Sequence, residues 1–141
     1  MCCEGCVEKP NLKIEKTCLL DLLIIGAGPA GVTCALQARR DGLRIKLLSD
    51  QPLGGLLPAA RRIDNLPGFP GISGSELARR LAAQAHDAQL PFESQKVTGL
   101  MRVAGGFAAR IEGGQVIHPR AVCLATGTRP RAWTEFPLPD G

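Results

Sequence analysis

The sequence predicts an α/β domain built on a parallel sheet. Residues 19–25 and 44–48 are short, nearly continuous apolar runs, the pattern of strands buried on both faces. A helical stretch over residues 29–40 lies between them, so the three elements have the size of a right-handed parallel crossover. With 141 residues, the chain is long enough for one domain or part of one.

Composition and charge exclude several classes of protein. The chain is 45% hydrophobic and 21% charged, as folded globular proteins are. Its net charge of +4 comes from scattered arginines with few aromatic residues, so we expect no nucleic-acid partner. The longest apolar run, 18–25, is interrupted by Asp21 and is shorter than the roughly 20 residues of a membrane span. We therefore expect no membrane segment and, without a secretory signal, a cytoplasmic location.

Four of the six cysteines precede the regular pattern. They are Cys2, Cys3, Cys6 and Cys18. Residues 1–18 have no helical or strand period, which predicts a flexible tail. These thiols could bind zinc or an iron–sulfur centre, but such sites need four well-placed ligands in ordered surroundings, so we predict no metal site. Cys34 and Cys123 fall in apolar segments and are expected to behave as small buried hydrophobic residues.

The middle of the chain predicts a long loop followed by a helix. Residues 49–71 are rich in proline and glycine, and a loop of this length inside a domain is a candidate ligand wall. Ser73 and Glu76 then form an S-x-x-E capping box, which starts a helix that runs to about Ala88. Leu77 and Leu81 lie on its apolar face.

The period shortens to two after Pro91, with glycine pairs between the segments. Segments near 92–97, 100–103, 107–111 and 115–117 therefore predict a small antiparallel meander. A last apolar strand over 121–125 follows it. We expect the domain to cover residues 19–130 and the proline-containing residues 131–141 to form an irregular tail.

A glycine turn after the first strand predicts the chemistry. Its residues are Gly26, Ala27, Gly28, Pro29, Ala30 and Gly31. In such a turn Gly26 permits the tight bend, Gly28 lets the backbone approach phosphates, and Gly31 lets helix and strand pack closely. The helix N-terminus adds free amides and a positive dipole. Because the motif follows a buried strand and opens a helix, it predicts a Rossmann-like dinucleotide site.

An acid at the end of the second strand binds the ribose hydroxyls in many such folds. Here Ser49 holds that place and Asp50 follows it. Either Asp50 reaches the ribose, or Ser49 makes a weaker neutral hydrogen bond, or Asp50 caps a turn.

Four motifs, in this order, resemble the flavin domain of low-molecular-weight thioredoxin reductases and related flavoproteins. They are GAGPAG at 26–31, GG at 54–55, IDNLPGFPGISG at 63–74 and ATGTRPR at 125–131. The resemblance implies a three-layer Rossmann-like FAD-binding domain, a parallel sheet combined with the meander, with the pyrophosphate over residues 26–31.

The resemblance also implies further contacts with FAD. The backbone of Gly54 and Gly55 and the side chain of Asn65 would line the flavin side, and Val97 would meet the adenine through its backbone. Asn65 can also be read as a turn residue before Pro67. The residues that would pass close to the cofactor at the last strand are Ala125, Thr126 and Gly127.

The chain departs from this family in three respects. Leu56 follows the GG pair where the family usually has glutamine. The family's nicotinamide domain, which binds NAD(P)H and carries the redox-active CxxC pair, is absent, as is the last stretch of its flavin domain. With only two substantial helices to cover a parallel sheet, we expect an incomplete flavin domain, lacking its C-terminal part and leaving the sheet partly uncovered.

The leading hypothesis is the FAD-binding part of a thioredoxin-reductase-like flavoprotein oxidoreductase, with no catalytic residue of its own. It would need a redox protein or the missing nicotinamide-domain segment as a partner, and the sequence predicts no oligomeric state. One alternative is a non-catalytic binding module or remnant that keeps the nucleotide pocket. Another replaces FAD by NAD, since the glycine turn recognises only the pyrophosphate.

Overall fold

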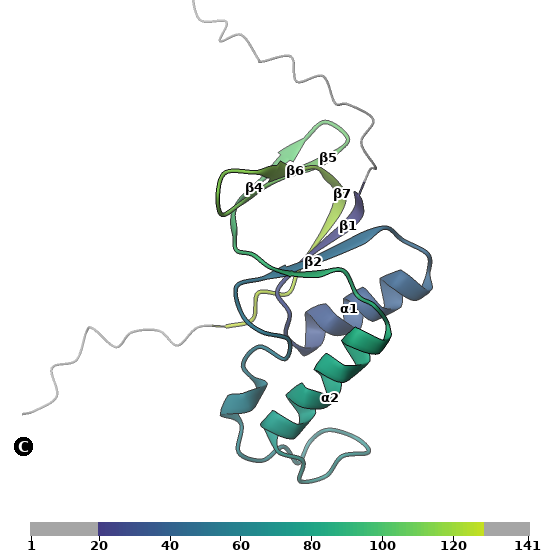
Figure 1. The fold of residues 1–141 in the computed structure, drawn as a ribbon, viewed down its shortest axis with the longest axis vertical. Helices are drawn as coiled ribbons and strands as arrows, with labels where there is room; N and C mark the ends of the chain where they lie inside the picture. The colour runs from purple at the N-terminus through teal and green to yellow at the C-terminus, as the bar shows by residue number, and fades with distance from the viewer. Residues whose placement is uncertain (1–19, 129–141) are drawn as a thin grey trace, which may run out of the picture.

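A parallel sheet runs through the middle of the computed structural model, which describes residues 20–128 (Figure 1). The four strands stand in the order β3-β2-β1-β7. They are β1 (Leu20–Ile25), β2 (Ile45–Ser49), β3 (Phe92–Ser94) and β7 (Pro119–Leu124). The parallel sheet predicted from the sequence is confirmed. The predicted tails, 1–18 and 131–141, lie outside the described residues.

The two central strands form the predicted crossover unit. β1 pairs in parallel with β2, with Leu22 opposite Ile45. Leu23 and Ile24, which are adjacent and point to opposite faces, are both fully buried, so β1 is covered on both sides. This burial explains why the strand is a continuous apolar run rather than an alternating one.

The helices α1 (Pro29–Arg40) and α2 (Gly74–Asp87) lie together on one face of the sheet (Figure 1). α1 starts with Pro29, whose missing N–H costs nothing at the first helical position. It ends before Gly42, which adopts a positive φ of 77°. Val32 and Ala35 of α1 are fully buried against the sheet.

α2 begins as predicted, with half of the capping box. The Ser73 hydroxyl accepts a hydrogen bond from the Glu76 backbone N–H at 3.2 Å. The Glu76 carboxylate accepts bonds from Arg79 and Arg80 instead of turning back to the cap, and these guanidinium groups lower its pKa to about 2. The hydroxyl half of the motif therefore starts the helix.

A small antiparallel sheet covers the second face of the parallel sheet. Its strands β4 (Val97–Val103), β5 (Gly106–Ile111) and β6 (Val116–Ile117) stand in that order. Ala109 and Ile111 of β5 pack against Leu23 and Leu48 of the parallel sheet. The meander supplies a third layer over the central strands of this face (Figure 1). The expectation of a partly uncovered sheet is confirmed at β7, where most residues are exposed or half-buried and Leu124 is 67% exposed.

The assignment of residues 92–97 to the meander is also wrong. β3 is a parallel strand of the main sheet, with Phe92 opposite Leu47 and Ser94 opposite Ser49. Phe92 packs against the helix-side core, so both its side chain and its backbone favour the main sheet. The meander proper begins at Val97.

The predicted loop between β2 and α2 is confirmed. It contains a short 3₁₀ helix, η1 (Leu57–Ala59), and a single antiparallel bridge between Ile63 and Ile72. The guanidinium of Arg80 lies 5.3 Å from the centre of the Phe69 ring and fastens the loop to α2.

Cys34 and Cys123 are half-buried and pack against the helix-side core, as predicted. Burial, with a hydrogen bond to Cys123, raises the pKa of the Cys34 thiol. Within residues 20–128, His, Cys, Asp and Glu form no group of three that could hold a metal ion. No helix in this range has the length and apolar character needed to span a membrane. The other four cysteines lie outside the described residues.

Asp21 ties β1 to the residues that begin its two neighbouring strands. Its carboxylate accepts hydrogen bonds from the backbone N–H and the guanidinium of Arg44, which precedes β2. The guanidinium of Arg120 in β7 lies 3.7 Å away. The hydrogen bonds from Arg44 lower the pKa of Asp21 from 3.8 to about 2.

Replacing Asp21 by Asn should remove a pH-dependent part of the stability. Because the pKa is lowered in the folded chain, the stabilisation is complete above the unfolded pKa of 3.8 and is lost as the pH falls towards about 2. We expect D21N to melt below the wild type at pH 7, with a gap that shrinks between pH 4 and pH 2. Circular dichroism melts at each pH measure the gap. Asp87→Asn, at a side chain 83% exposed, is the control, and a D21N gap that is constant with pH would contradict the prediction.

Candidate functional site

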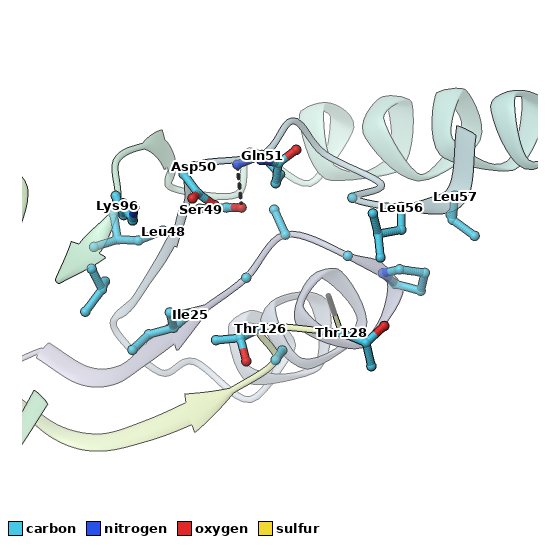
Figure 2. Close-up of a pocket in the computed structure, with 18 of the residues that line it drawn as sticks. Ile25, Leu48, Ser49, Asp50, Gln51, Leu56, Leu57, Lys96, Thr126 and Thr128 are labelled. Carbon is cyan, nitrogen blue, oxygen red and sulfur yellow. Dashed lines mark hydrogen bonds between the residues drawn. The ribbon is translucent and has the colours of Figure 1, made fainter. Parts of the chain in front are cut away.

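A cavity of about 810 Å³ opens at the carboxyl edge of the parallel sheet (Figure 2). It lies where β1, β2 and β7 end, which is the edge where open α/β sheets bind ligands. The lining residues are 25–29, 48–51, 55–57, 60, 96–97 and 125–128. The cavity is therefore built from the turn after β1, the loop after β2, the connection from β3 to β4, and the segment after β7.

Two glycines of the turn are required by the packing of the protein itself. Gly26 has a φ of 108°, and a Cβ atom there would stand 2.1 Å from the carbonyl oxygen of Ala125. A Cβ atom at Gly31 would stand 1.8 Å from the carbonyl oxygen of Gly26. These contacts leave no room for a side chain where β1, α1 and the end of β7 meet.

Gly28 differs from both. Its φ of −72° and ψ of −177° suit any residue, and apart from its chain neighbours no atom of residues 20–128 would lie within 4 Å of a Cβ atom there. It stands at the N-cap of α1, where a side chain that caps the helix would ordinarily be favoured. The space beside it is the cavity. Glycine at this position leaves the backbone and the amides of the first helical turn open to the cavity.

Gly54 and Gly55 hold the loop wall against the turn. Both have a positive φ, of 100° and 55°. The Gly54 N–H donates to the Ala27 carbonyl at 2.8 Å, and a Cβ atom at Gly55 would stand 3.2 Å from the Cα of Gly28. Gly55 lines the cavity, while Gly54 precedes it in the loop and is not a lining residue.

The end of β2 carries polar groups on the cavity wall. The buried Ser49 hydroxyl accepts a hydrogen bond from the Gln51 N–H at 3.0 Å, so Ser49 caps the turn that leads into the loop. Asp50 and Gln51 line the cavity beside it. Both Ser49 and Asp50 stay within reach of a bound ligand, and the choice between them as a ribose contact stays a prediction.

The structure brings most of the predicted site residues together. Those that line the cavity are Gly26, Ala27, Gly28, Pro29, Ser49, Asp50, Gly55, Val97, Ala125, Thr126 and Gly127. Gly31 and Gly54 support the lining from behind, and Ala30 is exposed in the first turn of α1. Asn65 lies exposed in the loop between Ile63 and Ile72 and is not part of the lining.

Some lining residues were not predicted from the sequence. Lys96 reaches the cavity because β3 pairs with β2 and so brings the connection after β3 to this edge. A strand of three residues is too short for its sequence to indicate which strand it pairs with. Leu57 and Ala60 lie in the loop that the sequence marked as a ligand wall, so its unusual length was the available signal.

The cavity is lined by both polar and apolar side chains. Figure 2 shows Ser49, Asp50 and Lys96 on the same side as Leu48 and Ile25, and Leu56, Leu57 and Thr128 on the other side. Leu56 is 60% exposed and lines the cavity. Such a site suits a ligand with an anionic group at the helix N-terminus and with both polar and apolar parts. The described lining contains no cysteine or histidine.

Comparisons with known proteins agree with this geometry. Residues 20–139 match the pyridine nucleotide-disulphide oxidoreductase family. A 34.2 kDa protein in the rubredoxin operon of Clostridium pasteurianum is 34% identical over 131 residues, covering 92% of this chain and 40% of that protein. A ferredoxin–NADP reductase of Lactiplantibacillus plantarum is 37% identical over 116 residues, covering 77% of this chain and 34% of that protein.

Solved structures give the same result. The crystal structure of T. acidophilum thioredoxin reductase superposes with a TM-score of 0.73 at 32% identity, covering 81% of this chain and 37% of that chain. The chain thus spans 34% to 40% of the length of the three proteins compared. The chain belongs to the pyridine nucleotide-disulphide oxidoreductase family, and its described residues have the three-layer Rossmann-like fold of thioredoxin reductases, as the motifs predict.

Proposed function

We propose that this chain binds FAD and forms the flavin-holding part of a thioredoxin-reductase-like oxidoreductase. The observation that carries the proposal is Gly28, whose glycine identity nothing in the described protein requires and whose free side faces the cavity. A backbone kept bare beside a helix N-terminus is what a pyrophosphate needs in order to approach.

The lining residues fit the parts of FAD in order. The amides of the first turn of α1 would bind the pyrophosphate. Ser49, Asp50 and Lys96 would hold the adenosine end, and Leu56 and Leu57 would offer apolar surface to the ring system. The motifs at 63–74 and 125–131, which resemble the flavin domain of thioredoxin reductases, support FAD over NAD.

The contribution of this chain to catalysis is to bind and orient. When bound, FAD supplies the exchange of a hydride between a nicotinamide and an acceptor. Thr126 and Leu56, which line the cavity, would help to position the ring and would exclude water from part of it. As the resemblance implies, the nicotinamide site and the redox-active thiols would come from a nicotinamide-domain segment or a separate redox protein.

Equilibrium dialysis against FAD tests the proposal. We expect saturable binding of one FAD for each chain, read by flavin absorbance, with NAD competing at least tenfold more weakly. Binding that does not saturate would contradict the site. Equal affinity for NAD would contradict the choice of cofactor and favour a general dinucleotide module.

Gly28→Ala should separate ligand binding from stability. The new methyl group would occupy the space reserved for the phosphates, so we expect at least a tenfold loss of FAD affinity. Because that methyl group meets no protein atom, the free energy of unfolding should change by no more than about 1 kcal/mol, the size of an N-cap effect. Dialysis and urea unfolding measure the two quantities.

Gly42→Ala is the matched control for this variant. Gly42 has a positive φ and lies outside the cavity lining. The substitution should therefore cost about 1 kcal/mol of stability through backbone strain and leave FAD affinity unchanged. If Gly28→Ala bound FAD as tightly as the wild type, the role assigned to Gly28 would be wrong.

A further inference from the structure

The wall of the cavity rests on α2 at two points one helical turn apart. The Gly74 N–H donates to the carbonyl of Ala60 at 2.9 Å, and a Cβ atom at Gly74 would stand 1.8 Å from the carbonyl oxygen of Leu57. At the second point, a Cβ atom at Gly54 would stand 2.7 Å from the Cβ of Ala78. Residues four apart share a helix face, so Gly74 and Ala78 support the loop together.

The opposite side of the same loop faces the glycine turn. Gly54 donates its N–H to Ala27, and Gly55 packs against Gly28. Neither glycine has a side chain, so the loop here is a single backbone layer between α2 and the turn. Because only this backbone separates α2 from the turn, a displacement of the loop on its α2 side also moves the backbone that contacts Gly28.

We propose that Ala78 is a positioning residue for the ligand site, which acts through Gly54 and does not itself line the cavity. Ala78 is 7% exposed and sits directly against Gly54. A larger side chain at position 78 can be accommodated in two ways. It pushes Gly54 and Gly55 towards Gly28 and narrows the cavity, or it moves α2 outward together with Ala60, which is hydrogen-bonded to Gly74. Both movements change the part of the cavity lining that would contact the ligand.

This inference rests on the proposed binding of FAD, and Ala85 provides the comparison that isolates it. Ala85 is the same residue type on the same helix and is buried to 2% exposure, but it belongs to the core formed with α1 and the sheet. An enlarged residue there overpacks the core and should lower the melting temperature. As long as the chain remains folded at the assay temperature, that loss of stability leaves the dissociation constant almost unchanged.

The experiment compares Ala78→Val with Ala85→Val in the full chain, by equilibrium dialysis with FAD and by melting without ligand. We expect Ala78→Val to bind FAD at least tenfold more weakly than the wild type. Ala85→Val should melt at a lower temperature and keep its affinity within about twofold. Ala78→Ser, which adds a single oxygen atom, should give a smaller loss of affinity and provides the test if the valine variant does not fold.

The possible results distinguish a failure of the role of Ala78 from a failure of the proposed FAD binding. If the wild type fails to bind FAD, the proposed function falls, and this inference falls with it. If the wild type binds and the Ala78 variants bind equally well, only the role of Ala78 is overturned. Losses of affinity in Ala78→Val and Ala85→Val that follow their melting temperatures alike would likewise overturn it.

Discussion

Three backbone segments meet at the carboxyl edge of the parallel sheet, and glycines stand at the two closest approaches between them. The turn after β1 passes against the carbonyl of Ala125 at Gly26, and the first turn of α1 passes against the carbonyl of Gly26 at Gly31. β1 also pairs with β7 up to Leu124, and the Ala125 N–H donates to the Ile25 carbonyl. This close approach sets the direction of α1 and the position of the segment after β7. The helix N-terminus and the lining residues 125–128 are consequently held at one cavity.

The glycines around this meeting point serve two purposes. Gly26, Gly31 and Gly54 make room for neighbouring protein atoms, whereas Gly28 leaves space that no described protein atom fills. The cavity is thus bounded by backbone that cannot easily move and by one position kept open. Packing on both faces of the sheet, by α1 and by β5, keeps this frame rigid. The polar and apolar side chains of the lining would then contact different parts of an elongated ligand.

Local sequence signals predicted the elements whose pattern is long or chemically distinctive. The apolar run of β1, the GAGPAG turn, and Ser73 at the start of α2 each specify structure through neighbours in sequence. Contacts between segments that are distant in sequence were not predicted. β3 is too short to show a period, and neither its place beside β2 nor the cover that β5 gives the sheet follows from any local pattern. The position of Lys96 at the cavity and the contact between Gly54 and Ala78 depend on contacts between segments that are distant in sequence. They could therefore be identified only from the structure.

The turn between β1 and α1 is proposed as the anchor of a dinucleotide. Backbone amide NMR shifts of the ¹⁵N-labelled chain, followed during titration with FAD, show whether a ligand binds there. We expect the largest shifts at Gly28, Ala30 and Gly31, with further shifts at Gly55 and Thr126 and almost none in the distant hairpin turn at Gly105. Shifts centred away from residues 26–31, or none at saturating FAD, would contradict it.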